Sequence, residues 1–204
     1  MKKILCYGDS NTYGFAPAVG MRFDENTRWT GILAKLLEEK FEIIEEGANN
    51  RTGCVDNPAG FLFSAQRHFP KIISKQKDID ILILAIGSND LQAQYDITFK
   101  TFERGIENLI QIAQKYVKNI ILVPSVILDN SVLEGFFNVQ FDETSVSKSK
   151  KIGKVYRKLA DIYGCRLFDI NEFATPSKDD GLHYDANSHK LIAKNLADFI
   201  LQKF

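Results

Sequence analysis

The chain has 204 residues, which is long enough for one substantial hydrophobic core, and we expect a single domain over residues 1–204. Basic and acidic residues number 26 each, so the formal net charge is zero and no overall positive field exists to attract nucleic acid. No apolar stretch approaches the ~20 residues of a membrane span, and the apolar run before Gly8 is too short for a signal-peptide core. These features predict a cytoplasmic protein that binds no nucleic acid and has no membrane span.

The three cysteines, Cys6, Cys54 and Cys165, are odd in number and widely spaced. That arrangement matches neither a disulfide framework nor the ligand spacing of a metal site. Cys6 and Cys165 also fall in apolar, strand-like runs. We therefore expect reduced cysteines in the core and no bound metal.

The first half of the chain alternates strand-like runs with a helical periodicity. Apolar residues from Trp29 to Leu37 recur on one stripe, as in an amphipathic helix. Between 41 and 47 apolar and acidic residues alternate, which predicts a strand with one exposed side. In chain order the predicted elements are a strand at 3–8, a helix at 28–40, a strand at 41–47, a loop at 48–63 and a helix at 64–76 that is interrupted near Pro70.

The second half begins with a continuous apolar run from Asp80 to Gly87, which is typical of a central parallel strand covered on both faces. The connector at roughly 171–186 is long and has no periodicity, and such loops in a compact domain are often functional. In chain order the predicted elements are a strand at 80–87, a helix at 98–117, a strand at 119–125, an irregular stretch at 126–146, a helix at 147–163, a strand at 165–170 and a helix at about 187–203.

Five strands alternating with helices predict right-handed crossovers and a parallel sheet with helices on both faces. We therefore expect an α/β protein with one three-layer αβα domain and a five-stranded parallel sheet in the flavodoxin-like order 2-1-3-4-5. Strands 2, 1 and 3 are neighbours in that order. The loops that follow them, at 48–53, 8–14 and 87–90, should meet at the rim where open α/β sheets place their ligands.

Ser10 follows the first strand in the turn Gly8-Asp9-Ser10. A serine or an aspartate at such a position commonly caps the next helix by accepting hydrogen bonds from its first amides. A serine hydroxyl becomes a nucleophile only when a base removes its proton. Ser10 alone leaves a helix cap, a phosphate ligand and a nucleophile open, so the choice depends on a base elsewhere in the chain.

His183 is the histidine best placed to be that base. It lies in the long connector, and Asp180 precedes it by three residues, so a single turn can bring the carboxylate to one imidazole nitrogen. The other nitrogen would then be free for Ser10. We expect His68, in a predicted helix, to be structural and His189 to be a surface or packing residue. A solvated acidic loop that contains a histidine is the alternative for this segment.

Asn89 lies just past the central strand in Gly87-Ser88-Asn89-Asp90. Asparagine commonly forms turns, but its neutral NH₂ group is also suited to donate to a developing oxyanion. The loop at 47–53 could aim a backbone N–H at the same point or be an ordinary turn. Spacing alone does not select a residue within that loop.

These positions together resemble the SGNH hydrolases, also called the GDSL esterase/lipase family. The matching blocks run in order across nearly the whole chain and are Gly8-Asp9-Ser10, Gly87-Ser88-Asn89-Asp90 and Asp180-Gly181-Leu182-His183. The resemblance implies that Ser10 is the nucleophile, His183 the base and Asp180 the acid that orients it. It also implies that the Asn89 side chain is an oxyanion donor, that the chain has the SGNH hydrolase fold, and that no metal or organic cofactor is needed.

The remaining block is looser. Glu45-Glu46-Gly47 followed by Arg51-Thr52, with Arg28-Trp29-Thr30-Gly31, resembles a bacterial arylesterase and acyltransferase branch of the family. In that branch the residue before Arg-Thr supplies a backbone N–H, which implies an oxyanion hole of Ser10, Asn50 and Asn89. The chain departs from the family at Asn50, where a small residue is usual, and at Asn11, where many members have leucine. A backbone donor survives the first change.

The resemblance implies a serine esterase whose substrate is a small ester. It would hydrolyse or transfer short acyl groups, such as acetyl, from small, aryl or sugar alcohols. The aromatic residues that could line an apolar site are Tyr13, Phe15 and Trp29, and core packing is the alternative for Trp29. Phe136-Phe137 and Phe141 could cover a longer acyl chain or form a subunit contact. A lysophospholipase or thioesterase of the same family and a homo-oligomer therefore stay open.

Two other classes of function stay open beside the esterase. A non-catalytic, flavodoxin-like binder of phosphate or flavin would cradle its ligand with Ser10, Asn11 and Thr12 after the first strand. That alternative gives the other matched residues no shared task. An inactive, esterase-like interaction protein is the third hypothesis, and the intact residues Ser10, Asp180 and His183 argue against it.

Overall fold

A five-stranded, entirely parallel sheet forms the centre of the computed structural model, which describes residues 1–76 and 78–204. The strand order is β2-β1-β3-β4-β5, as predicted. The strands are β1 (Lys2–Gly8), β2 (Phe41–Gly47), β3 (Ile81–Ala85), β4 (Asn119–Val123) and β5 (Arg166–Leu167). The chain therefore forms the predicted α/β domain.

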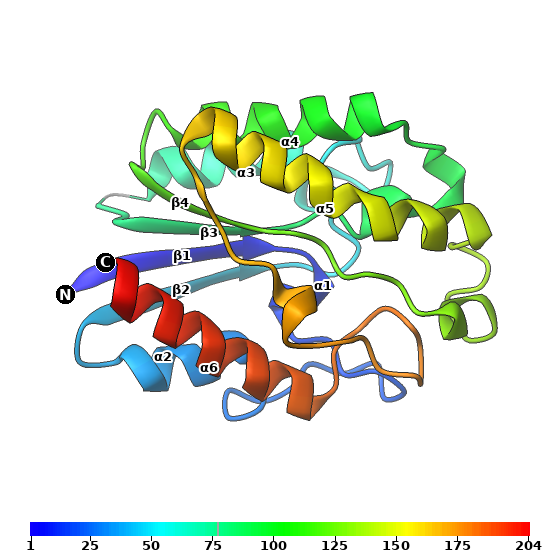
Figure 1. The fold of residues 1–204 in the computed structure, drawn as a ribbon, viewed down its shortest axis with the longest axis horizontal. Coiled ribbons are helices and arrows are strands. Elements are labelled where there is room, and N and C mark those ends of the chain that lie inside the picture. Colours follow the sequence, from blue (N-terminus) through cyan, green and yellow to red (C-terminus); the bar gives the residue numbers. More distant parts are fainter. Residues whose placement is uncertain (77) are drawn as a thin grey trace.

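Helices cover both faces of this sheet and make three layers (Figure 1). One face is covered by α2 and α6, which contact each other, and the other face by α3, α4 and α5. The two termini lie at the same end of the sheet, where the Lys2 ammonium donates to the Phe204 carbonyl at 3.1 Å. The long helices are α2 (Trp29–Leu37), α3 (Ala65–Lys75), α4 (Phe99–Ala113), α5 (Glu143–Tyr163) and α6 (Ala186–Lys203).

The hydrophobic core lies on both sides of the three central strands. Every residue from Ile4 to Tyr7 and from Ile81 to Leu84 is almost completely buried. A parallel strand covered by helices on two faces needs apolar side chains in both directions, which is why these segments are continuous apolar runs. β2 lies at the edge, where its acidic residues reach solvent more easily, as its alternating pattern predicted.

Several elements differ in their bounds from the sequence-based expectations. Helix α4 ends at Ala113 rather than at 117, and α2 ends at Leu37 rather than at 40. Helix α3 runs through Pro70 without the predicted interruption, because the buried side chains of Phe69 and Ile73 hold it against the core. Helix α5 begins at Glu143 rather than at 147. The Asp142 carboxylate accepts the Ser145 N–H at 2.7 Å and forms a capping box with this residue.

The last strand is shorter than predicted. β5 pairs with β4 only over residues 166–167, instead of the expected 165–170. Cys165 lies before the strand, because its N–H still bonds to the Ala160 carbonyl at the end of α5. Asp169 then caps a 3₁₀ turn at Ile170–Glu172, which ends the extended conformation.

The carboxyl ends of β1, β2 and β3 lie side by side, since Gly8 pairs with Gly47 and with Ala85. Gly8 has no room for a side chain. A Cβ atom there would lie 2.1 Å from the Thr12 hydroxyl and 2.2 Å from the Ala85 carbonyl. The chain can therefore turn directly from β1 into the next segment and bring the three predicted loops to one rim.

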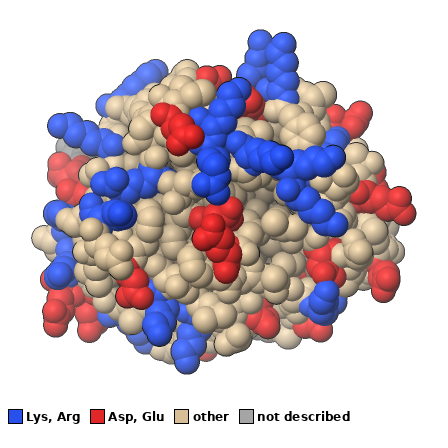
Figure 2. Space-filling view, viewed as in Figure 1, with Lys and Arg blue, Asp and Glu red and all other residues tan. Residues whose placement is uncertain are grey.

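Charges of both signs are interspersed on the face that Figure 2 shows, with basic side chains gathered along the part that α5 occupies. The basic residues of α5 are Lys148, Lys150, Lys151, Lys154, Arg157 and Lys158. Lys158 pairs with Glu103 and Lys148 with Asp96. Within the described ranges, no helix is both long and apolar enough to cross a lipid bilayer.

Candidate active site

Asp9, and not Ser10, caps the short helix α1 (Ser10–Tyr13). The Asp9 carboxylate accepts the Asn11 N–H at 3.0 Å and the Ser88 hydroxyl at 2.8 Å. Ser10 is the first helical residue, so its hydroxyl is free of the capping role. Amides in the first turn have no acceptor within their own helix, which leaves the Ser10 N–H available to a ligand.

The Ser10 hydroxyl lies against His183, which comes from the opposite end of the sequence. The His183 Nε2 atom is 2.8 Å from the Ser10 Oγ atom, and its Nδ1 atom is 2.8 Å from the Asp180 Oδ2 atom. All three side chains are buried. The structure thus brings together a hydroxyl, an imidazole and a carboxylate in the arrangement that serine hydrolases use.

The loop at 180–183 wraps its backbone around the Asp180 carboxylate. The Asp180 Oδ1 atom accepts the N–H groups of Leu182 at 2.9 Å and of His183 at 2.8 Å. Burial raises the pKa of this carboxyl, but the hydrogen bond from His183, the charge of the imidazolium and the two amides outweigh burial and leave the pKa below its usual range. Asp180 is therefore ionised at neutral pH and can hold one imidazole tautomer.

Asn11 holds the backbone on both sides of His183. Its side-chain nitrogen donates to the Leu182 carbonyl at 3.2 Å, and its side-chain oxygen accepts the Tyr184 N–H at 3.1 Å. The Trp29 indole N–H in turn donates to the Asn11 carbonyl at 3.0 Å. From the sequence, Asn11 is a departure from the family pattern and a candidate phosphate ligand, and no local pattern links it to a loop 171 residues away.

Asn89 and Asn50 lie in one hydrogen-bond network at the rim. The Asn89 Nδ2 atom donates to the Arg51 carbonyl at 3.1 Å. The Gln92 Nε2 atom contacts the side-chain oxygens of Asn50 at 3.0 Å and of Asn89 at 3.2 Å. Asn50 has a φ of +57°, a left-handed conformation that glycine adopts freely and asparagine tolerates better than most residues.

Arg51 fixes the loop that carries Asn50. Its side chain is buried and donates to the carbonyls of Gly8 and Leu62, each at 3.0 Å, while its guanidinium stacks 4.5 Å from the centre of the Tyr7 ring. Burial lowers the pKa of Arg51, although the group keeps its charge because arginine is so strongly basic. The side chain ties the loop after β2 to the end of β1.

Asp90 fixes the same loop from the side of β3. Its buried carboxylate accepts three consecutive backbone N–H groups at 2.6–2.9 Å. The donors are Gly53, Cys54 and Val55. Burial raises the pKa of Asp90 to about 6, although these amides oppose the shift. The loops after β2 and β3 are therefore joined through both Asn89 and Asp90.

The other two histidines lie apart from this arrangement. His68 is buried, and its Nδ1 atom lies 3.1 Å from the Tyr7 hydroxyl. His189 is completely buried, which excludes a surface role, and its Nδ1 atom accepts the Trp29 N–H at 3.2 Å at the start of α2. Burial lowers the pKa of each imidazole to about 4. Both are neutral structural residues at physiological pH.

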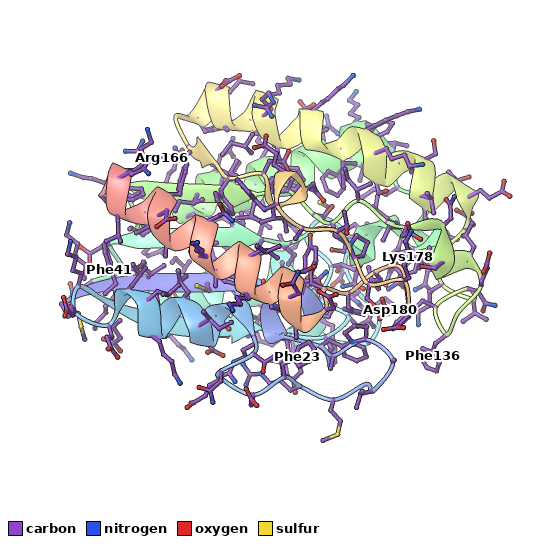
Figure 3. All side chains as sticks on the ribbon, turned by 60° about the horizontal axis from the view of Figure 1, so that its bottom comes forward. Phe23, Phe41, Phe136, Arg166, Lys178 and Asp180 are labelled. Carbon is purple, nitrogen blue, oxygen red and sulfur yellow. The ribbon has the colours of Figure 1, made fainter. Side chains whose placement is uncertain are left out.

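Two aromatic rings flank the imidazole of His183. The ring centroid of Phe15 lies 4.2 Å from that of His183, and the centroid of Phe137 lies 5.3 Å away. Phe136 packs edge-on against Phe137 and is 82% exposed, and it lies at the edge of the molecule on the same side as Asp180 (Figure 3).

The other aromatic candidates pack elsewhere. Trp29 is buried beneath α1, and Phe141 is also buried in the core. The ring of Tyr13 lies under the Arg22 guanidinium at 4.7 Å. These positions favour core packing for Trp29 and Phe141, and they leave the Phe15 and Phe137 pair as the aromatic surface beside the imidazole.

In the part of the chain that the structure describes, no group of three His, Cys, Asp or Glu side chains is arranged to hold a metal ion. The three cysteines are free thiols. Burial raises the pKa of the Cys54 thiol well above its ordinary value and that of Cys165 to about 11, so neither is a thiolate at neutral pH.

A three-layer αβα domain with a serine after the first strand and an Asp-x-x-His loop before the last helix is the architecture of an SGNH-type hydrolase. The sequence model of the GDSL-like Lipase/Acylhydrolase family matches residues 6–191. The chain belongs to this family, and its enzymatic class is that of the carboxylic ester hydrolases. A search of curated protein sequences finds no significant match.

Solved structures with the same fold include esterases. The aryl esterase of M. smegmatis is 26% identical in sequence, has a TM-score of 0.90, and the match covers 100% of both chains. A carbohydrate acetylesterase family member from Sinorhizobium meliloti is 27% identical with a TM-score of 0.87, and the match covers 99% of this chain and 98% of that chain. The predicted SGNH hydrolase fold and the resemblance to the arylesterase branch are thus confirmed.

Proposed function

We propose that this protein is a serine esterase that releases or transfers short acyl groups through a triad of Ser10, His183 and Asp180. The single observation that carries the proposal is the continuous chain of 2.8 Å contacts from the Ser10 hydroxyl through the imidazole to the Asp180 carboxylate. Asp9 caps the helix, so Ser10 has no competing structural task. The proposed site needs no metal and no organic cofactor.

In the first half of the reaction, the Ser10 Oγ atom attacks the ester carbonyl carbon while His183 Nε2 takes the hydroxyl proton. The carbonyl oxygen becomes an oxyanion. We assign its stabilisation to the backbone N–H groups of Ser10 and Asn50 and to the second N–H of the Asn89 side chain, whose first donates to Arg51. Asp180 stabilises the imidazolium that forms.

The tetrahedral intermediate then collapses. The bond between the carbonyl carbon and the alkoxy oxygen breaks, and the imidazolium gives its proton to the leaving alcohol. The acyl group stays on Ser10 as an ester. A water molecule, or a second alcohol, attacks this acyl-enzyme with His183 again as base, which yields the acid or a new ester and restores Ser10.

The surroundings of His183 support an apolar or aryl leaving group. The imidazole protonates the alcohol, so the alcohol must bind near the rings of Phe15 and Phe137. Flat, apolar groups pack well against such rings. The similarity to an aryl esterase and to a carbohydrate acetylesterase family member further supports short acyl groups on aryl or sugar alcohols as substrates.

A non-catalytic binder of phosphate or flavin is less well supported. That function would use Ser10, Asn11 and Thr12, but the Asn11 side chain is engaged by the backbone around His183. It would also leave the Asp180 and His183 pair without a task. The family match points to acyl hydrolysis as well.

The test is hydrolysis of p-nitrophenyl esters with acyl chains from acetyl to long chains, together with acyl-coenzyme A. We expect the highest kcat/KM for acetyl or propionyl esters, and Ser10→Ala should lower kcat by at least about 10³-fold while the protein stays folded. A Ser10→Ala variant that keeps wild-type turnover would reject the mechanism. A maximum at long acyl chains or on coenzyme A esters would instead indicate a lysophospholipase or a thioesterase.

A further inference from the structure

Gln92 is a buried polar residue that contacts two of the proposed oxyanion donors. It directly follows the 3₁₀ turn Asn89–Leu91, and its side chain is only 2% exposed. Its Nε2 atom lies 3.0 Å from the Asn50 Oδ1 atom and 3.2 Å from the Asn89 Oδ1 atom. One side chain therefore joins the loop after β2 to the loop after β3.

The chemistry of these contacts fixes which way each amide points. An amide nitrogen has two hydrogens and accepts no hydrogen bond, so Gln92 Nε2 requires an oxygen from both Asn50 and Asn89. The Asn89 Nδ2 atom must then face away from Gln92, where it donates to the Arg51 carbonyl at 3.1 Å. A flipped Asn89 amide would place oxygen against oxygen at Arg51 and nitrogen against nitrogen at Gln92.

Gln92 is itself held in one orientation. The Arg51 carbonyl can only accept, so it fixes the Asn89 amide, and the Asn89 Oδ1 atom in turn requires the Gln92 Nε2 atom as its donor. The Gln92 Oε1 atom then accepts a hydrogen bond from the Gln94 Nε2 atom at 2.7 Å. The network thus runs in one direction, from Gln94 through Gln92 to Asn89 and the Arg51 carbonyl. Hydrogen bonds in such a chain polarise one another and strengthen the last donor.

The Gln92 Nε2 atom also stabilises Asn50 in its left-handed conformation, at a φ of +57°. The Asn50 carbonyl accepts the Asn57 side-chain nitrogen at 2.8 Å, so the residue is held through both its side chain and its backbone. The direction of the Asn50 N–H depends on that conformation. A side chain at this position is therefore not only tolerated but used to anchor the loop.

We propose that Gln92 is a positioning residue that sets the direction of the Asn50 and Asn89 donors toward the oxyanion. This inference rests on the proposed serine esterase function. Gln92 acts through the two asparagines and touches neither the substrate nor Ser10. Its contribution appears in the transition state, because the oxyanion forms only there, and not in the binding of the ground-state ester.

Two substitutions test the proposal. Gln92→Met keeps the size of the side chain but removes the donor, and Gln92→Glu keeps the shape but replaces the NH₂ group with a second oxygen. With p-nitrophenyl acetate, we expect each to lower kcat at least tenfold, less than the roughly 10²–10³ expected for the loss of a whole donor in Asn89→Ala, while KM stays within about twofold. The affinity for phenylboronic acid, which forms a tetrahedral adduct with serine, should weaken in parallel with kcat.

The Glu variant provides a readout that a purely structural role would not change. A protonated carboxyl regains one donor, so the ratio of its kcat to that of the wild type should rise as the pH falls from 8 to 5. In the double variant Asn89→Ala/Gln92→Met, the loss should be smaller than the product of the single losses, because Gln92 acts partly through Asn89. The matched control is Gln111→Glu. The wild-type Gln111 side chain donates to the Tyr163 hydroxyl on the surface formed by α4 and α5.

The proposal is overturned if both Gln92 variants have kcat within twofold of the wild type, if the Glu variant shows a flat ratio across this pH range, or if the losses in the double variant multiply. Failure of the esterase mechanism itself would look different, because Ser10→Ala would then keep its activity. A large loss in Ser10→Ala and Asn89→Ala with wild-type Gln92 variants would reject only the role of Gln92.

Discussion

Replacing Asn11 by leucine should damage both stability and activity. The Asn11 amide makes two buried hydrogen bonds, to the Leu182 carbonyl at 3.2 Å and from the Tyr184 N–H at 3.1 Å. Leucine has the same number and branching of side-chain heavy atoms, although it is larger in volume, and it satisfies neither group. The substitution therefore leaves one acceptor and one donor without partners next to His183.

The magnitude follows from these two groups. Each buried polar group that loses its partner costs about 1–3 kcal/mol, and the more apolar leucine returns about 1–2 kcal/mol of burial energy. At the midpoints of these ranges, we expect the free energy of unfolding to fall by about 2–3 kcal/mol. The imidazole loses part of its backbone support, and since displacement of a catalytic group by 1 Å can cost about 10² in rate, kcat should fall about tenfold or more.

The assay combines urea unfolding with steady-state hydrolysis of p-nitrophenyl acetate at a temperature where each variant is folded. Asn195→Leu is the matched control, because the Asn195 side chain donates to the Leu191 carbonyl of its own helix on the surface of α6. The free energy of unfolding of this variant should lie within about 0.5 kcal/mol of that of the wild type. If Asn11→Leu matched this control in both stability and kcat, the two Asn11 hydrogen bonds would not be what holds the backbone around His183.

Two further predictions concern the aromatic surface and the buried histidine. Phe137→Ala should lower kcat/KM about tenfold for p-nitrophenyl acetate and by less for vinyl acetate, because Phe137 lies beside the imidazole that protonates the alcohol. Replacing the exposed Phe136 by alanine should change kcat/KM little for either ester. Equal losses on both esters in Phe137→Ala would contradict the role of Phe137 in binding the aryl alcohol. Burial lowers the pKa of His189 to about 4 in the folded protein, whereas an unfolded histidine has a pKa of about 6.5. The neutral imidazole therefore stabilises the fold above about pH 6.5, and this stabilisation is lost as the pH falls toward 4, because the unfolded chain binds the proton first. Between pH 7 and pH 5 this histidine should lower the free energy of unfolding by about 2 kcal/mol. His189→Asn retains an acceptor for the Trp29 N–H, so its free energy of unfolding, measured in urea, should depend less steeply on pH than that of the wild type. The same pH dependence in both proteins would contradict the lowered pKa of His189.

The central part of the fold could be predicted because its signals are local. β1, β3 and β4 are apolar runs, and their alternation with amphipathic helices leaves few topologies. The predicted bounds were wrong where tertiary contacts or helix caps determine where an element begins or ends. Pro70 does not break α3 because packing compensates for one lost hydrogen bond, and α5 begins four residues early because Asp142 and Ser145 form a capping box. That Asp-x-x-Ser pattern was visible in the sequence and could have been used.

The candidate site could be predicted only as far as its residues share a short motif. Asp180 and His183 are three residues apart, and their geometry follows from one turn. The supporting contacts have no such signal. Asn11 reaches a loop 171 residues away, and Gln92 reaches Asn50 across 42 residues, through single side chains that no periodicity marks. The left-handed φ of Asn50, a conformation that favours glycine, likewise has no signal in the sequence.

The most direct test of the central claim is labelling with a fluorophosphonate, which reacts covalently with an activated serine. We expect one label per chain, located on Ser10 by peptide mass spectrometry, with esterase activity lost in proportion to labelling. His183→Ala should react far more slowly although its Ser10 is intact, because the base is absent. A folded, active protein that takes no label on Ser10, or that takes it equally fast without His183, would contradict the roles of Ser10 as nucleophile and His183 as base.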